Sequence, residues 1–411
     1  MSNNQVQTNS PPAAPSQDLS NINLNLKNTP DPTKLSKGQI AGIIIGFIIV
    51  AAIAVGVYLL IKKSKDKDKG VNWLAVGDGQ HRILSSEDGI DWNTTNYTPN
   101  IAVNAVAYGT DDIDQTLWVA ATNHDSTQDS TFIYSYDGNN WLPGTGLSFN
   151  GGGHGVAYGL SSDDTTPLWV AVGKDSTTNH NILYSLDGQS WDQVAGTFTN
   201  QINSVAYGLS SNGTSGKWIA VGNGASIFSS LDGQTWTLKA PPAGQTSVNF
   251  ESVAYGLSSN GTNVWVATGS SNGNSFIYSN DGGDSWSEDT SGFFNPGGGK
   301  GVAFGLSSSG TSLWVGVGGI TGADSIKHSE NVKNWTEGSG IKFSSGGTGV
   351  AYGNNIWVAV GDDSTNEILY SNDGQSWKPT SGAKFSSTGL AVASKYLNPS
   401  LESKSSKLFP S

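Results

Sequence analysis

The sequence predicts an all-β fold, a seven-bladed β-propeller of four-stranded blades closed by a C-terminal strand, together with one transmembrane α-helix. The chain contains 14 tryptophans, which form pairs that recur about every 50 residues, as in a stacked repeat of one unit. The first member of each pair opens an apolar block: Trp73, Trp118, Trp169, Trp218, Trp265, Trp314 and Trp357. The second follows a polar turn: Trp92, Trp141, Trp191, Trp236, Trp286, Trp335 and Trp377. Such an all-strand repeat favours a closed propeller over a helical solenoid.

Three short apolar segments recur in each unit ahead of the turn. The first reads Val-Ala-Tyr-Gly or a close variant, and it ends at Gly109, Gly159, Gly208, Gly256, Gly305 and Gly353. The second reads Trp-Val-Ala-Val-Gly, as in Trp169–Gly173, and the third reads Ile-x-Tyr-Ser, as in Ile182–Ser185. The second tryptophan then begins a fourth short strand. Both faces of the second segment are apolar, which is expected for a sheet packed between two others.

The two ends of the repeat array complement one another. The first unit begins at Val71 and lacks a Val-Ala-Tyr-Gly segment, whereas the chain ends with an unmatched Gly389-Leu390-Ala391-Val392-Ala393. We therefore expect this late segment to supply the innermost strand of the first blade. Closure of this kind leaves no free sheet edge between the first and last blades, and it sets the propeller at residues 71–394.

Ser-x-Asp-Gly turns precede the second tryptophans, as in Ser86–Trp92. Aspartate accepts backbone N–H groups in a tight turn, glycine supplies positive φ, and the tryptophan covers the loop. These turns resemble the Asp-box, or sialidase-type neuraminidase, repeat; Ser279–Trp286 matches it best, while Ser329–Trp335 lacks the Asp-Gly pair. The resemblance spans Val71–Ser394 and implies the fold, which occurs in glycosidases, sorting-receptor ectodomains and photosystem assembly factors. A catalytic or Ca²⁺-binding role for the aspartates is the alternative to turn formation.

No catalytic set is evident in the sequence. Sialidases hold the substrate carboxylate with three arginines, and this chain contains only Arg82. A general glycosidase needs two facing carboxylates, and Glu251 is the one acidic residue that the repeat places near the axis.

The five histidines lack metal-ligand spacing, and there is no cysteine. The run Gly151–Gly155 precedes a strand rather than a helix, so a propeller loop is favoured over a phosphate loop. We expect no enzyme activity, metal or cofactor.

The propeller is acidic. Val71–Ser394 contains 28 Asp and Glu against 10 Lys and Arg, and 10 − 28 gives a net charge of −18. Phosphate backbones require a basic surface, so nucleic acid is excluded as the expected partner.

The N-terminal part predicts a single-pass membrane anchor. Residues 1–39 form a polar tail expected to be disordered, and Ile40–Ile61 is an uncharged run long enough to cross a bilayer, with a buried core helix as the alternative. The linker 62–70 has five lysines against three before the span, which favours a propeller on the cytoplasmic or interior side. Asn-x-Ser/Thr triplets in the propeller oppose that orientation. The Gly-x-x-x-Gly spacing of Gly42 and Gly46 predicts that two such helices dimerise. The alternative is that it reflects the ordinary frequency of glycine in membrane helices.

One position varies around an otherwise constant ring. It lies two residues before each Val-Ala-Tyr segment, at the expected top mouth of the channel: Asn104, His154, Asn203, Glu251, Lys300, Thr348 and Thr388. We interpret this rim as a binding surface, against the alternative of a solvent-filled mouth that varies freely. The tether and the tail 395–411 should leave the opposite, bottom face. The expected function is a membrane-anchored, non-catalytic scaffold for a protein partner; the alternatives are a carbohydrate-binding propeller and, less favoured, a glycoside hydrolase.

Overall fold

The computed structural model describes residues 70–126, 130–270, 275–292, 294–319, 324–404 and 408. The predicted transmembrane segment Ile40–Ile61, the linker lysines, Gly42 and Gly46 all lie outside these residues, so the membrane anchor stays a prediction. Within the described part of the chain, no helix has the length and apolar character needed to cross a bilayer.

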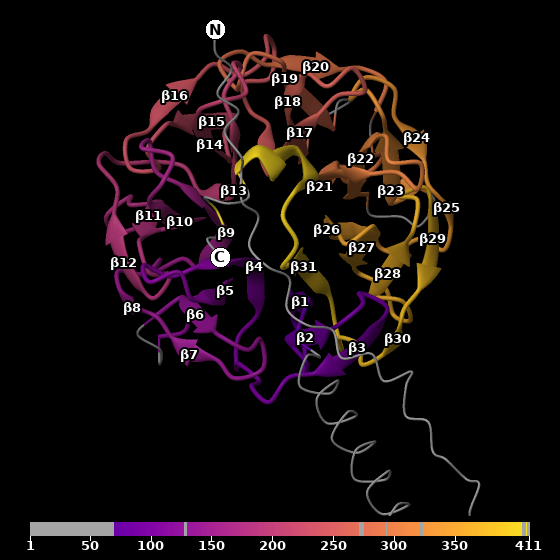
Figure 1. The fold of residues 1–411 in the computed structure, drawn as a ribbon, viewed down its shortest axis with the longest axis horizontal. Coiled ribbons are helices and arrows are strands. Elements are labelled where there is room, and N and C mark those ends of the chain that lie inside the picture. The colour runs from indigo at the N-terminus through magenta and orange to yellow at the C-terminus, as the bar shows by residue number, and fades with distance from the viewer. Residues whose placement is uncertain are drawn as a thin grey trace, which may run out of the picture. The chain divides into compact units, whose positions relative to one another are not determined.

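Seven antiparallel sheets surround a central axis, which confirms the predicted seven-bladed propeller (Figure 1). The innermost strands of blades 1 to 7 are β31 (Gly389–Ser394), β4 (Val103–Thr110), β9 (Gly153–Leu160), β13 (Ile202–Leu209), β17 (Asn249–Leu257), β21 (Gly299–Leu306) and β26 (Gly347–Gly353). The second strands are β1 (Trp73–Gly77), β5 (Thr116–Thr122), β10 (Pro167–Gly173), β14 (Gly216–Gly222), β18 (Asn263–Ser270), β22 (Ser312–Gly318) and β27 (Ile356–Gly361).

The outer half of each blade is shorter. The third strands are β2 (Ile83–Ser86), β6 (Phe132–Ser135), β11 (Ile182–Ser185), β15 (Ser226–Ser230), β19 (Phe276–Ser279), β23 (Ile326–Ser329) and β28 (Ile368–Ser371). The fourth strands are β3 (Asp91–Thr94), β7 (Leu142–Pro143), β12 (Ser190–Gln193), β16 (Thr237–Lys239), β20 (Ser287–Asp289), β24 (Thr336–Glu337) and β29 (Ser376–Pro379). We call the face where innermost strands begin the top, and the face where they end the bottom.

The predicted closure of the ring is confirmed. Strand β31 pairs antiparallel with β1, with Leu74 opposite Ala393 and Ala75 opposite Val392. The N-terminal and C-terminal ends of the repeat array therefore complete one sheet, and neither end leaves a free edge at the junction between the first and last blades.

The Val-Ala-Tyr-Gly segment interlocks neighbouring blades. In five of the innermost strands, the aromatic ring packs onto the segment's glycine in the preceding blade so closely that a methyl group there would overlap the ring: Gly109 with Tyr158, Gly159 with Tyr207, Gly208 with Tyr255, Gly256 with Phe304, and Gly305 with Tyr352. The tryptophan of the second strand adds a hydrogen bond across the same boundary. For example, the indole N–H of Trp169 donates to the Thr110 carbonyl at 2.8 Å. The repeated residues thus hold blade to blade as well as filling each blade's core.

The turns have the predicted chemistry. In the first blade, an Asp88 carboxylate oxygen accepts the backbone N–H groups of Ile90 and Asp91 at 2.8 and 2.9 Å, and the Trp92 indole donates to Gly89. In the sixth blade, Asn331 replaces the aspartate and accepts two backbone N–H groups in the same way. Val332 then takes the glycine's left-handed conformation, with φ of 60°. Its side chain is buried in the core, which offsets that backbone strain.

A feature that the sequence did not predict joins the outer edges of some blades. Three blades gain a fifth, parallel strand from the preceding blade: β8 (Thr145–Gly146), β25 (Ser339–Gly340) and β30 (Ser381–Gly382). The glycine in each has φ between 82° and 87°, and a side chain there would overlap the carbonyl oxygen of the tryptophan in the next blade. The described connector from blade 1 to blade 2 forms no such strand.

Candidate binding site at the top mouth of the channel

A β-bulge places one residue of each innermost strand at the top mouth of the channel. In β4, Val103 pairs with Thr122 and Ala105 with Ala121, so Asn104 is left between them without a partner in the ladder. The same shift recurs in β13, β17, β21 and β26. A bulged residue leaves the regular alternation of side chains. The variable position of the sequence is therefore the bulge residue, which explains why it can vary while its neighbours stay constant.

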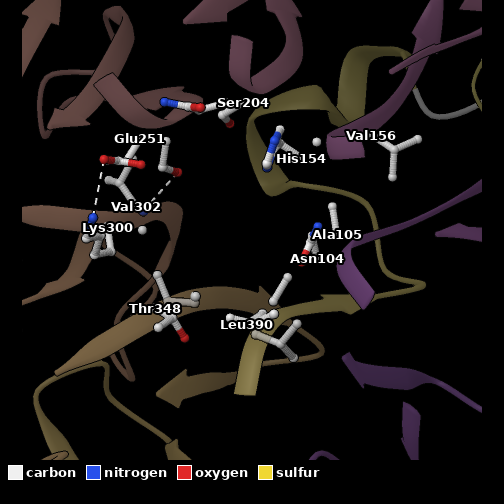
Figure 2. Close-up of a pocket in the computed structure, with 18 of the residues that line it drawn as sticks. Asn104, Ala105, His154, Val156, Ser204, Glu251, Lys300, Val302, Thr348 and Leu390 are labelled. Carbon is white, nitrogen blue, oxygen red and sulfur yellow. Dashed lines mark hydrogen bonds and ion pairs between the residues drawn. The ribbon is translucent and has the colours of Figure 1, made fainter. Parts of the chain in front are cut away.

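These bulge residues line a cavity of about 180 Å³ at the axis (Figure 2). Six of the seven predicted rim residues belong to it, and all are partly buried: Asn104, His154, Asn203, Glu251, Lys300 and Thr348. The remaining lining consists of small and aliphatic residues of the same strands, such as Ala105 and Val156. No phenyl, phenol or indole ring of the described residues lines it.

The seventh predicted rim residue, Thr388, is wrong as a member of this ring. In β31 the bulge falls between Ala391, which pairs with Val76, and Gly389, which pairs with Gly77. Leu390 is therefore the residue that matches Asn104, and it lines the cavity. Thr388 lies just before the strand, where its carbonyl accepts the Asp78 N–H at 2.9 Å. The error arose because the orphan segment lacks the aromatic residue that aligns the other repeats.

Glu251 has a partner that the sequence did not reveal. The ammonium of Lys300, on the next blade, lies 3.2 Å from a Glu251 carboxylate oxygen, and the two side chains point toward one another in Figure 2. Glu251 is the only carboxylate among the residues that line the cavity. Glycoside hydrolysis uses two carboxyl groups on opposite sides of the scissile bond. The arrangement at this mouth is instead an ion pair.

Three other rim side chains bond across blade boundaries. The Asn104 amide donates to the Gly153 carbonyl at 2.8 Å, and the Asn203 amide donates to the Phe250 carbonyl at 2.8 Å. The Thr348 hydroxyl donates to the Gly389 carbonyl. Each of these side chains therefore helps to fix the inner ring, and mutation of the rim will affect stability as well as any binding role.

Two serines support the ring in the same way, and the sequence analysis missed them. The Ser204 hydroxyl accepts the Val253 N–H at 3.2 Å, and the Ser252 hydroxyl accepts the Val302 N–H at 3.3 Å. The signal was present, because serine follows the variable residue in these two blades where alanine, glycine or another small residue follows it elsewhere.

His154 differs from the other polar rim residues. Its Nε2 atom is buried and has no hydrogen-bond partner. Burial, reinforced by the nearby Lys174 ammonium, lowers the pKa of His154 below its ordinary value of 6.5. The imidazole is accordingly neutral at neutral pH, and it lies across the cavity from the Glu251–Lys300 pair (Figure 2).

The depressed pKa of His154 predicts a pH-dependent stability. As the pH falls through 6.5 the unfolded chain binds a proton that the folded chain still excludes, so the stabilisation present above 6.5 is lost toward acid. We expect the melting temperature to fall less between about pH 8 and about pH 5.5 in His154→Asn than in the wild type. An identical acid loss in His154→Asn would contradict this account.

Two loops of the top face, between the second and third strands of their blades, carry Asp-Ser-Thr at residues 175–177 and 363–365 and form polar turns. Asp175 accepts the backbone N–H groups of Thr177 and Thr178, and Asp363 accepts those of Thr365 and Asn366. Asp363 also accepts the Ser344 N–H of the connector from the preceding blade. Among the described residues, no group of three or more histidine, aspartate or glutamate side chains is placed to hold a metal ion.

The chain is similar to solved structures only at low sequence identity. No family model and no curated protein matches the chain. Among solved structures, YCF48 bound to D1 peptide is 16% identical over 75% of this chain and 85% of that chain, with a TM-score of 0.44. An ancestral GH74 enzyme is 13% identical over 75% of this chain and 53% of that chain, with a TM-score of 0.48. The GH74 xyloglucanase from Xanthomonas campestris is 16% identical over 76% and 59%, with a TM-score of 0.42.

Proposed function

We propose that this chain is a membrane-anchored, non-catalytic propeller that binds a protein partner at the top mouth of its channel. The Asp-box relationship of its turns and the anchor at Ile40–Ile61 are parts of this proposal. The observation that carries it is the Glu251–Lys300 ion pair at 3.2 Å, because the one carboxylate that lines the mouth is paired with an ammonium and not with the second carboxyl group that glycoside hydrolysis uses.

The rest of the mouth supports a protein partner over a small ligand. Small-molecule sites are mostly apolar and aromatic concavities that enclose their ligand, whereas this cavity is small, has no aromatic carbocycle among its described lining residues, and carries amides, a hydroxyl, a histidine and one ion pair beside its aliphatic residues. Charged groups and hydrogen-bonding groups on a surface fix the orientation in which a protein partner binds. Because β1 begins at the bottom face and the C-terminal segment crosses that face, the top mouth is the side free to meet a soluble protein (Figure 1).

Site-specific photocrosslinking tests this proposal. Leu390 lines the cavity and can be replaced by a photoreactive phenylalanine without removing a polar contact of the rim. The matched control carries the same probe at Asn280, which is exposed in a bottom-face turn. In the native setting we expect a discrete crosslinked protein from position 390 and none from position 280.

Three outcomes would contradict the proposal in different ways. A crosslink from position 280 alone would move the binding surface to the bottom face. Binding to a glycan array that is lost on Glu251→Gln would favour the carbohydrate-binding alternative. Hydrolysis of an aryl glycoside, abolished by the same substitution, would make the chain an enzyme.

A further inference from the structure

The C-terminal segment folds back across the bottom mouth of the channel, as the yellow trace over the middle of the ring shows (Figure 1). After β31 the chain continues through Lys395 into the 3₁₀ helix η5 (Pro399–Lys404). Leu401 is 6% exposed and Leu408 is 1% exposed, and both belong to the apolar cluster that contains Tyr207 and Tyr255. The sequence predicted only that this tail leaves the propeller from the bottom face.

Polar contacts hold the same segment through its backbone and one amide. The Asn398 side chain donates to the Tyr255 carbonyl at 2.9 Å, and the Tyr158 hydroxyl donates to the Leu408 carbonyl at 2.9 Å. Apolar anchors combined with main-chain hydrogen bonds are the usual means by which a protein surface holds a short peptide.

The mouth beneath the segment is an incompletely filled apolar ring. Innermost strands of neighbouring blades contribute valine, alanine and tyrosine side chains, among them Val156, Tyr158, Val205 and Tyr207. A pocket of about 250 Å³, open to solvent, is bounded by these side chains and by the segment. The mouth therefore has room for side chains bulkier than those that the chain's own segment inserts.

We propose that the bottom mouth is a peptide-docking site and that the C-terminal segment, described at residues 395–404 and 408, is its intramolecular ligand, bound reversibly. The chemistry of the ligand is a short peptide with two leucines seven residues apart and an asparagine ahead of the first. Docking is reversible because two opposing free energies are balanced. The burial of two leucines and a few hydrogen bonds favour the docked state, and the conformational entropy lost on ordering the whole segment opposes it. This site lies on the face opposite the proposed partner surface and does not depend on it.

A peptide-binding measurement on the full chain tests the proposal. The probe is a fluorescent synthetic peptide of residues 395–411, and the receptor is the full chain carrying Leu401→Asp and Leu408→Asp, which weakens the intramolecular ligand. We expect this variant to bind the peptide at least about 100-fold more tightly than the wild type, whose own segment competes at a high effective concentration. The same peptide with both leucines changed to aspartate should not bind.

A matched control replaces two leucines that are exposed elsewhere, Leu231 and Leu238, by aspartate. This variant should resemble the wild type, because its segment still fills the mouth. The proposal is overturned if the Leu401/Leu408 variant keeps the wild-type circular dichroism and does not bind the peptide. It is equally overturned if wild type and variant bind the peptide with the same affinity.

Hydrogen exchange on the wild type keeps the proposal falsifiable if the double variant does not fold. The Leu401 amide donates within the segment to Asn398, and the Val205 amide lies in the inner strand β13. A reversibly docked segment opens without global unfolding, so the Leu401 amide should exchange at least about 100-fold faster than that of Val205. Equal protection of the two amides would mean that the segment is a permanent part of the core and would overturn the proposal.

Discussion

Replacing Gly208 with alanine is expected to destabilise the propeller by about 3 kcal/mol, at the upper end of the usual cost of overpacking a core. The added methyl group would overlap the ring of Tyr255, which is 1% exposed and is held at its hydroxyl by Asn263 at 2.6 Å. The ring cannot rotate away without breaking that hydrogen bond or entering the next blade. Urea unfolding followed by tryptophan fluorescence measures the change.

Two companion variants show whether the Tyr255 ring is the cause. Gly70 has no atom closer than 4.0 Å to an added methyl, so Gly70→Ala should leave the urea midpoint unchanged. Tyr255→Ala should be costly by itself, but in the Tyr255→Ala background the further change Gly208→Ala should cost much less than in the wild type. Additive effects would mean that the blade interlock is not what excludes a side chain at position 208.

Ending the chain at Thr388 is expected to abolish the folded propeller. The truncation removes β31, and with it the innermost strand of the first blade and the pairing of Ala75 with Val392. It exposes the edge of β1 and the apolar faces of both neighbouring blades, a loss comparable to the whole free energy of unfolding of about 5–15 kcal/mol that is typical of a domain. We expect aggregation, or no cooperative thermal transition by circular dichroism.

A chain ending at Lys395 is the matched control, because it lacks the C-terminal segment and retains all seven sheets. It should melt cooperatively, at a temperature no higher than that of the full chain. A Thr388 truncation that melts like this control would show that closure by β31 contributes little to the ring. If neither truncated chain folds cooperatively, the segment after β31 is what stabilises the ring.

The candidate site was only partly predictable. The sequence correctly placed Asn104, His154 and their equivalents around one mouth, because a bulge residue repeats at the same offset from a constant motif. It could not reveal that Lys300 lies 3.2 Å from Glu251, since the two residues are far apart in the chain and meet only across a blade boundary. The displacement of Thr388 by Leu390 has another origin, because the orphan segment lacks the aromatic residue that aligns the other repeats.

The sequence by itself determined the blade count, the four-strand blade, the turn chemistry and the closing strand. All of these depend on local patterns, namely strand alternation, glycine and aspartate in turns, and the missing first segment. Only the tertiary structure decided the Tyr–Gly interlock, the parallel outer strands, the ion pair at the top mouth and the seating of Leu401 and Leu408 at the bottom mouth. Each of these joins residues from different blades, or from a blade and the tail, and such contacts are set by the geometry of the closed ring rather than by neighbours in the chain.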